Sequence, residues 1–158
     1  MTLKGEIMKY DFNNIVNKYK AAQKKIVFVC GCFDILHCGH IELLNFAKSL
    51  GDILIVGLNS DSSVRALKGK NRPIYKQGQR LFMIEALKCV DNVVIFDETN
   101  ACVLIEFIRP DIFVLGNEYK YKKISENHSA ELCGCKIIYY DKNTDISTTQ
   151  IIEKITNR

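Results

Sequence analysis

The segment Gly31-Cys32-Phe33-Asp34-Ile35-Leu36-His37-Cys38-Gly39-His40 places two histidines three positions apart, between an apolar run and a helical pattern. Residues 26–30 are typical of a buried strand, and the apolar spacing from Ile41 onward predicts a helix. A helix that starts here offers free N–H groups and the positive end of its dipole, both suited to phosphate oxygens. Gly39 lets an anion approach the main chain, and imidazoles can donate to phosphoryl charge. The segment therefore predicts a phosphate-binding turn.

Strand and helix patterns alternate on both sides of this turn. The sequence predicts strands at 26–30, 53–58, 92–96, 112–115 and 136–140, and helices at 12–22, 39–50, 61–67, 79–89, 100–108, 125–133 and 147–155. Gly51, Pro110 and Gly134 are expected to follow helix ends, and Ser125 and Ser147 to cap helix starts. Five apolar strands that alternate with helices indicate an α/β fold with a parallel sheet covered on both faces.

Length and composition indicate a single soluble domain. The chain has 158 residues, for which we expect an N-terminal helical extension at 1–24 and one domain at 25–158. No apolar run approaches the length of a membrane span, and the charged N-terminus lacks the apolar core of an export signal. We therefore expect a cytoplasmic protein without membrane contacts. The odd number of cysteines, seven, argues for reduced thiols.

The charge of the chain favours a small polyanionic ligand. The net charge is only +4, and the one basic cluster comprises Lys68, Lys70, Arg72 and Lys76. A nucleic-acid partner would require a broader basic face, so none is expected. The cluster lies in the long connection from 68 to 79, and such loops are usually functional or mobile. Its basic residues either form a solvated surface or contact phosphate.

Polar residues follow most of the predicted strands. Ligands of parallel α/β sheets gather beyond the carboxyl ends of the strands, where the strand order switches. The candidates at these positions are His37, His40, Asn59, Ser60, Asp61, Gly116, Asn117, Glu118 and residues 145–149. Ser147, Thr148 and Thr149 suit a second phosphate cradle at a helix start, although Ser147 has an equally good explanation as a simple N-cap.

The chain resembles the cytidylyltransferase-like nucleotidyltransferases, an HxGH superfamily with a Rossmann-like three-layer fold. The stretches that carry the resemblance are VFVCGCFDILHCGHIELL, GDILIVGLNSDSSVRALKGKNRPI, QRLFMIEALKCVDNVVIFDE, LIEFIRPDIFVLGNEY and ISTTQII. They are most similar to the D-glycero-β-D-manno-heptose 1-phosphate adenylyltransferases of ADP-heptose synthesis. The bacterial glycerol-3-phosphate cytidylyltransferases are the next most similar group.

The resemblance implies transfer of a nucleoside monophosphate from ATP or CTP to a phosphorylated sugar or polyol, with Mg²⁺ bound alongside the triphosphate. Pyrophosphate leaves, and no covalent intermediate forms. The motif match assigns catalytic roles to His37, His40, Lys68 and Arg80, and nucleotide binding to Gly31, Cys32, Phe33, Ser147, Thr148 and Thr149. By their positions, Gly39 and Asn117 are further candidates for nucleotide binding, and Asp34, Asn59, Asp61 and Arg72 are the candidates for substrate binding. Asp34 has the alternative of fixing its turn by hydrogen bonds. No metal ligand is assigned to the protein, and a homodimer is implied.

Three positions depart from the heptose-enzyme pattern, so the acceptor stays open. Cys30 replaces an Asn, Leu115 a Lys, and Asp145 a Gly. An apolar residue at 115 is shared with the glycerol-phosphate enzymes, whereas LKGKNRPI is typical of the heptose enzymes. An enzyme that makes a CDP-polyol is the alternative within the superfamily.

Two other classes of function compete with the enzyme. Cys30, Cys32, His37, Cys38 and His40 lie within eleven residues and could form a metal or thiol site. A nucleotide-binding regulator on the same fold is the other alternative, because a fold does not determine a function.

Overall fold

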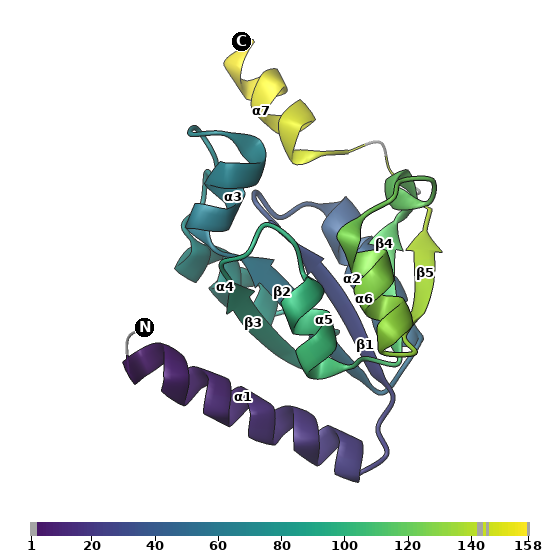
Figure 1. Cartoon of the computed structure of the whole chain (residues 1–158). Coiled ribbons are helices and arrows are strands. Elements are labelled where there is room, and N and C mark those ends of the chain that lie inside the picture. The colour runs from purple at the N-terminus through teal and green to yellow at the C-terminus, as the bar shows by residue number, and fades with distance from the viewer. Residues whose placement is uncertain (1–2, 142–143, 145, 158) are drawn as a thin grey trace.

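The computed structural model describes residues 3–141, 144 and 146–157, and from residues 3–10 only the backbone. Its strands are β1 (Ile26–Gly31), β2 (Ile53–Asn59), β3 (Asn92–Phe96), β4 (Ile112–Gly116) and β5 (Lys136–Tyr140). They form one five-stranded sheet in the order β3-β2-β1-β4-β5, and all four neighbouring pairs are parallel (Figure 1). The prediction of a Rossmann-like α/β fold is confirmed.

Helices connect each strand to the next. The connecting helices are α2 (Cys38–Ser49), α3 (Asp61–Lys68), α4 (Gln77–Glu85), α5 (Cys102–Ile108) and α6 (Ser125–Leu132), with a 3₁₀ turn η1 at Asn117–Tyr119. Helix α1 (Leu3–Ala21) precedes β1, and α7 (Thr148–Thr156) follows β5. Ser147 caps α7, as predicted, because its side chain accepts a hydrogen bond from the N–H of Gln150. Ser125 does not cap α6: the cap position is Ile124, and Ser125 is the first helical residue. None of the helices described is long and apolar enough to cross a membrane.

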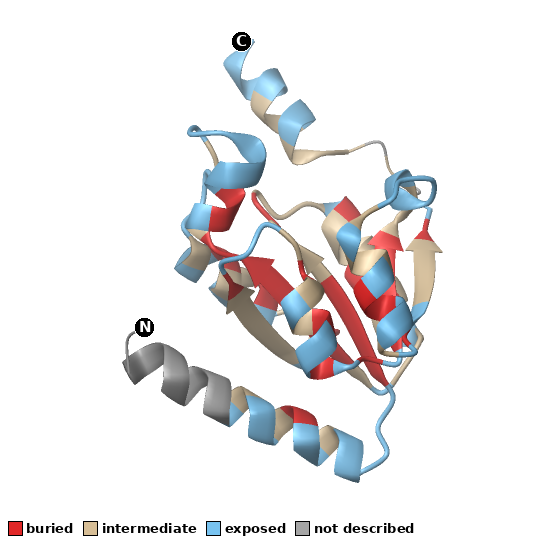
Figure 2. Ribbon diagram, in the orientation of Figure 1, coloured by how far each residue is buried: buried red, intermediate tan, exposed pale blue. Residues whose placement is uncertain are grey.

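The sheet separates two hydrophobic cores, because side chains alternate between the faces of each strand. Val27 and Val29 of β1 point into the core that α2 and α4 cover. Ile26 and Phe28 point into the core beneath α1, α5 and α6. Figure 2 shows the buried residues concentrated in the sheet and on the helix faces turned toward it. Apolar residues on both faces explain why the strands read as continuous apolar runs.

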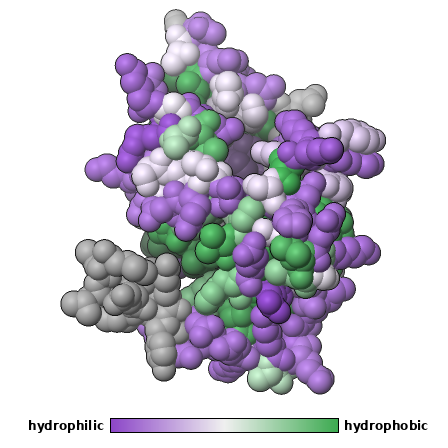
Figure 3. All heavy atoms as spheres, viewed as in Figure 1, coloured by the Kyte–Doolittle hydropathy of each residue, from purple (hydrophilic) through white to green (hydrophobic). Residues whose placement is uncertain are grey.

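Helix α1 packs on the sheet. Val16 is buried in the second core, and the Tyr19 hydroxyl donates a hydrogen bond of 2.6 Å to the Asn92 side chain in β3. The ring of Phe12 stacks on Phe107 of α5 with centroids 6.1 Å apart. Hydrophobic side chains also gather around this side of the molecule in Figure 3. The part of the extension whose side chains are described is therefore continuous with the core of the domain.

The strand order reverses between β1 and β4, which places a crevice at their carboxyl ends. The chain leaves β1 for α2 on one face and leaves β4 for η1 and α6 on the other (Figure 1). The surface is hollowed at this end of the sheet in the space-filling view (Figure 3).

Candidate active site

A cavity of about 610 Å³ opens at the carboxyl ends of β1, β2 and β4. Most of the residues predicted for the site line it: Gly31, Cys32, Phe33, Asp34, His37, Gly39, His40, Asn59, Lys68, Arg72, Ser147, Thr148 and Thr149. Cavities of this size hold typical small ligands. The predicted residues come from segments far apart in the chain, and the strand order brings them together.

The two histidines stand at the start of α2 and stack on each other. Their ring centroids are 3.7 Å apart, and the ring of Phe33 meets His40 edge-on at 5.2 Å. His40 Nδ1 accepts a hydrogen bond of 3.4 Å from the main-chain N–H of His37. In a neutral imidazole this acceptor leaves the ring proton on Nε2, so Nε2 can act as a donor. A Cβ at position 39 would lie 3.2 Å from the His37 ring, so glycine makes room for this pair.

Asp34 holds the loop between α3 and α4 against the histidine turn. Its carboxylate accepts hydrogen bonds from Arg72 Nε at 2.7 Å, from the N–H of Ile74 at 2.8 Å and from the N–H of Tyr75 at 3.0 Å. Burial alone would raise the pKa of Asp34, but these N–H donors and the charge of Arg72 outweigh burial and lower it. The structure thus shows Asp34 in the hydrogen-bonding role. Its carboxylate fixes the loop between α3 and α4 as well as its own turn.

The turn around Asp34 has a strained backbone. Phe33 and Ile35 both adopt left-handed conformations, with φ of 46° and 49°. Such φ values are unfavourable for residues with a Cβ, above all for a β-branched one, and persist only where the surroundings impose them. The three hydrogen bonds to the carboxylate supply that constraint.

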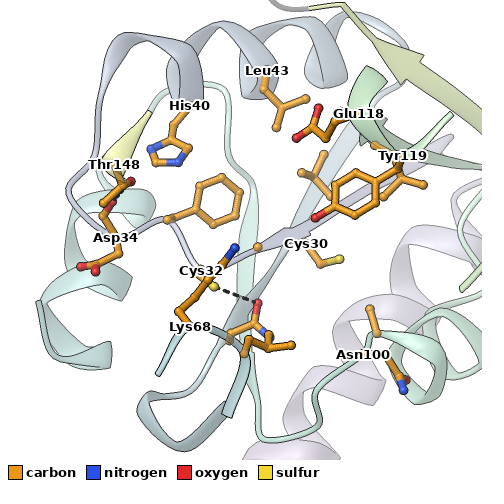
Figure 4. A pocket seen from close by; sticks show the side chains of 18 of the residues that line it. Cys30, Cys32, Asp34, His40, Leu43, Lys68, Asn100, Glu118, Tyr119 and Thr148 are labelled. Carbon is orange, nitrogen blue, oxygen red and sulfur yellow. Dashed lines mark hydrogen bonds between the residues drawn. The ribbon is translucent and has the colours of Figure 1, made fainter. Parts of the chain in front are cut away.

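The start of α7 joins the same site. Thr148 Oγ1 donates a hydrogen bond of 2.6 Å to the main-chain oxygen of Asp34, and Ser147 and Thr149 also line the cavity. The cavity therefore faces the starts of two helices, α2 and α7, together with Lys68 and Arg72. Figure 4 shows His40, Lys68 and Thr148 of this group. Anions are favoured at such a place. Asp145, singled out as a departure from the heptose pattern, lies outside the described residues.

Arg80 and Asp61 were predicted to contact ligands, but the structure places both beneath the cavity rather than on its lining. The Arg80 side chain is fully buried, and its guanidinium donates to the main-chain oxygens of Cys32, Asn59 and Tyr75 at 2.7, 2.7 and 3.0 Å. It also forms an ion pair of 2.9 Å with Asp61. Both charges are used inside the protein, where they join the ends of β1 and β2 to the loop before α4.

Asn59 lines the floor of the cavity and is held by neighbouring side chains. Its Nδ2 donates to Ser63 Oγ at 2.9 Å, and Cys32 Sγ lies 3.9 Å from its Oδ1. Asn117, by contrast, does not line the cavity, because its Nδ2 turns toward the Asp141 carboxylate at 3.3 Å. The next two residues, Glu118 and Tyr119, line it instead.

Sequence reasoning missed one wall of the cavity. Glu118 was named only as a residue after a strand and Ser125 only as a helix cap, and the other members of this wall were not singled out: Thr99, Asn100, Tyr119 and Glu126. Glu126 accepts hydrogen bonds from the N–H of Ala101 and from Ser125 Oγ, both at 3.2 Å. The available signal was the sequence GNEY at the end of β4, at the predicted switch point.

The cysteines do not converge on a metal ion. Cys30 and Cys32 line the cavity floor, whereas Cys38 is exposed at the start of α2. Among the residues that the structure describes, no three His, Cys, Asp or Glu side chains could share a metal ion. All seven cysteines are free thiols.

Comparison with known proteins identifies the family. A model of cytidylyltransferase-like proteins matches residues 28–154, which include the histidine turn and residues 147–149. The chain belongs to the cytidylyltransferase-like family. The resemblance stated from the motifs is confirmed.

Similar curated proteins carry the name bifunctional protein HldE. The chain is 50% identical over 139 residues to that of Campylobacter jejuni subsp. doylei, which covers 88% of this chain and 29% of the relative. It is 45% identical over 141 residues to that of Geobacter metallireducens, covering 89% of this chain and again 29% of the relative. This cytidylyltransferase-like chain thus spans less than a third of the curated relatives that it matches.

Two solved structures share the fold. The lipopolysaccharide core biosynthesis protein from Thermoplasma volcanium GSS1 is 33% identical, with a TM-score of 0.65 over 77% of this chain and 99% of the other. The pantoate-β-alanine ligase from Francisella tularensis, complexed with β,γ-ATP and β-alanine, is 18% identical, with a TM-score of 0.60 over 93% of this chain and 75% of the other. The second likeness concerns the fold alone.

Proposed function

We propose that this cytidylyltransferase-like chain transfers AMP from ATP to a heptose 1-phosphate and releases pyrophosphate. The observation that carries the proposal is the stacked histidine pair at the start of α2, which faces the same cavity as Ser147, Thr148 and Thr149. The identity of 45–50% to HldE proteins and the motif resemblance to heptose 1-phosphate adenylyltransferases support the acceptor. The product is an ADP-heptose, a precursor for bacterial surface polysaccharide.

The reaction is a direct displacement at phosphorus. An oxygen of the acceptor phosphate attacks the α-phosphorus of ATP, the bond between the α-phosphorus and the bridging oxygen to the β-phosphate breaks, and pyrophosphate leaves with that electron pair. His37 and His40 donate hydrogen bonds to the phosphate oxygens on which charge grows. Lys68 and Arg72 supply positive charge on the same side of the cavity. Catalysis depends on position and charge, and no side chain acts as a nucleophile.

Mg²⁺ fits this site as an ion that arrives with the triphosphate. The described part of the chain offers no cluster of three metal-ligating side chains, and the Asp34 carboxylate already accepts hydrogen bonds from three donors. Mg²⁺ usually keeps several waters and binds through substrate phosphates with one or two carboxylates, so a full protein cage is not required. When bound, it supplies neutralisation of the phosphate charge. The site of action is the bacterial cytoplasm, and the homodimer implied by the family stays a prediction.

Pyrophosphate release tests the proposal. Purified protein with Mg²⁺ is assayed with ATP, CTP, GTP and UTP against D-glycero-β-D-manno-heptose 1-phosphate, glycerol 3-phosphate and glucose 1-phosphate. We expect turnover with ATP and the heptose phosphate, and none when EDTA is in excess. Efficient turnover of glycerol 3-phosphate with CTP, without turnover of the heptose phosphate, would reject the acceptor and favour the CDP-polyol enzyme. The apolar Leu115 in the cavity is the observation that favours that alternative.

A further inference from the structure

The two ends of the cavity carry opposite charge. His40, Lys68 and Thr148 lie on one side of the view in Figure 4, and Glu118, Tyr119 and Asn100 lie on the other. Arg72 also belongs to the first side, where it is paired with the Asp34 carboxylate, so the unpaired cation there is Lys68 among the described residues. Glu126, bonded to the N–H of Ala101 next to Asn100, adds a second carboxylate to the other side. We call the second side the hydroxyl wall; it comprises Thr99, Asn100, Glu118, Tyr119, Ser125 and Glu126.

Two thiols on the floor show where the charge changes. Burial raises the pKa of both Cys30 and Cys32. At Cys30 the carboxylate of Glu126 raises the pKa further. At Cys32 the positive charges of Lys68, Arg80 and Arg72 oppose the rise. The two thiols therefore have different charged neighbours: a carboxylate at Cys30, and mainly basic side chains at Cys32.

Of the two carboxylates in the hydroxyl wall, Glu118 is the one that the fold does not use. Glu126 accepts hydrogen bonds from Ala101 and Ser125 and so holds the start of α5. Among the described residues, no hydrogen-bond or ion-pair partner engages the Glu118 carboxylate, which lies over Gly116 so closely that a side chain at 116 would collide with it. Glycine at the end of β4 thus leaves room for this carboxylate at the edge of the cavity.

Tyr119 supplies a hydroxyl beside this carboxylate. Burial and the neighbouring charge of Glu118 raise the pKa of Tyr119, so its phenol stays protonated and can donate a hydrogen bond at neutral pH. The wall thus combines carboxylate acceptors with a phenol, an amide and two aliphatic hydroxyls. This set of acceptors and donors matches neutral groups that carry several hydroxyls.

We propose that the hydroxyl wall binds the hydroxyl groups of the acceptor sugar, and that Glu118 is the residue that makes the enzyme prefer a sugar over a shorter polyol phosphate. This inference rests on the proposed function. The triphosphate then occupies the cationic side, at His37 and His40, and the acceptor phosphate meets it from the floor. A short acceptor such as glycerol 3-phosphate has fewer hydroxyls with which to reach Glu118.

Steady-state kinetics of Glu118→Gln test this assignment, because the substitution keeps the size of the side chain and removes its charge. A sugar hydroxyl donates more strongly to a carboxylate than to an amide, so we expect the KM for heptose 1-phosphate to rise about 5- to 10-fold. The KM for ATP and kcat should stay within about twofold. Glu131→Gln, which changes an exposed carboxylate of α6 that does not line the cavity, is the matched control and should leave every constant unchanged.

The possible results separate this inference from the proposed function. A rise in the KM for ATP with an unchanged KM for the sugar would assign the wall to the nucleotide and overturn the proposal. A Glu118→Gln variant with wild-type constants for both substrates would overturn it too. Failure of the proposed function is visible in the wild type, which would then not turn over the heptose phosphate. A wild type active only with glycerol 3-phosphate overturns the sugar subsite as well.

Discussion

The stacked rings of His37 and His40 show how one turn serves both the fold and the site. The His40 ring accepts a hydrogen bond from the main chain of His37, and its other nitrogen can therefore donate toward the cavity. Neighbouring side chains thus orient the donors before a ligand binds, and donors fixed in advance stabilise developing charge best.

We predict that His37→Ala and His40→Ala each lower kcat by about 100- to 1000-fold, because each removes a donor aimed at phosphate charge. Thermal unfolding should change little, since the rings lie at the cavity rather than in either core. Pyrophosphate release and a thermal melt check both expectations. His128→Ala, at an exposed position of α6, is the control. A folded variant with near-normal kcat would exclude that histidine from contact with the transition state.

Asp34 makes stability depend on pH. Its pKa in the folded protein lies below the ordinary value, because two N–H groups and Arg72 outweigh the effect of burial. The stabilisation from the charged form is therefore complete above the unfolded pKa of about 4 and is lost as pH falls through the lower folded pKa. We expect Asp34→Asn to lower the free energy of unfolding by about 2–3 kcal/mol at pH 7, and the difference to shrink below about pH 4.

Urea unfolding of both proteins between pH 3 and pH 7 measures this difference. Asp11→Asn, at an exposed position of α1, is the control. A difference that is constant across the pH range would contradict a role for the ionised carboxylate.

The sequence could identify the residue types of the site but not the direction of every side chain. Arg80 was assigned a catalytic role by the motif match, yet it lies in helical register with the buried Ile84, four positions later. That spacing was the available sign that Arg80 faces inward. Asn117 and Glu118 are both polar, and only the 3₁₀ turn after β4 decides which one faces the cavity.

At the scale of elements, the strands were predicted to within one residue, whereas several helix ends were not. Strands buried on both faces show clear apolar runs, so their limits are visible in the sequence. Helix α4 ends at Glu85 rather than 89, because Leu87 and Val90 enter tight turns while the apolar spacing continues. Helix α1 starts at Leu3 rather than 12, in a stretch that has no strong apolar period.

Arg80 joins three elements, so its loss should affect stability more than an exposed arginine does. Arg80→Met leaves Asp61 without its ion pair and three main-chain oxygens without their donor. Breaking a buried pair in this way typically costs about 3–5 kcal/mol. Denaturant unfolding should show this loss, and Arg65→Met on the exposed side of α3 should show almost none. A loss below about 1 kcal/mol for Arg80→Met would contradict the positioning role.

The loop at 69–76 should become less accessible when substrate binds. Arg72 and Lys68 face the cavity, whereas Lys70 at the tip is exposed. Closure over a triphosphate would order the tip, so trypsin cleavage after Lys70 should slow when ATP and Mg²⁺ are added. Cleavage in the presence of GTP serves as a control for nonspecific protection. An unchanged rate with ATP would mean that the loop does not respond to nucleotide.

At the scale of the whole molecule, the free cysteines report on the packing. A maleimide at pH 7.5 should label the exposed Cys38 first. Cys30 and Cys135 should react last, because burial raises the pKa of Cys30 and raises that of Cys135 to about 12, and the thiolate is the reactive form. ATP with Mg²⁺ should slow labelling of Cys32 on the cavity floor. Peptide mass spectrometry measures each rate, and fast labelling of Cys30 would contradict the packing of β1.

The overall topology could be predicted because alternation of strands and helices leaves few arrangements for a parallel sheet. The convergence of residues 31–40, 59, 68, 72 and 147–149 follows from the position of the switch between β1 and β4. The opposite charges of the two cavity walls could not be predicted, because they depend on which side chains turn inward after each strand.

Both reactants of the proposed reaction share one cavity, so an inhibitor need not imitate either of them alone. A compound that joins adenosine to a heptose through a stable phosphonate bridge would reach the cationic side and the hydroxyl wall together. Linking two ligands with the right spacing commonly increases affinity by about 10²–10⁴-fold over either one. Because its phosphonate bridge would contact the cationic side and its heptose the hydroxyl wall, such a compound would also bind in one orientation, which makes the polarity of the cavity a guide for inhibitor design.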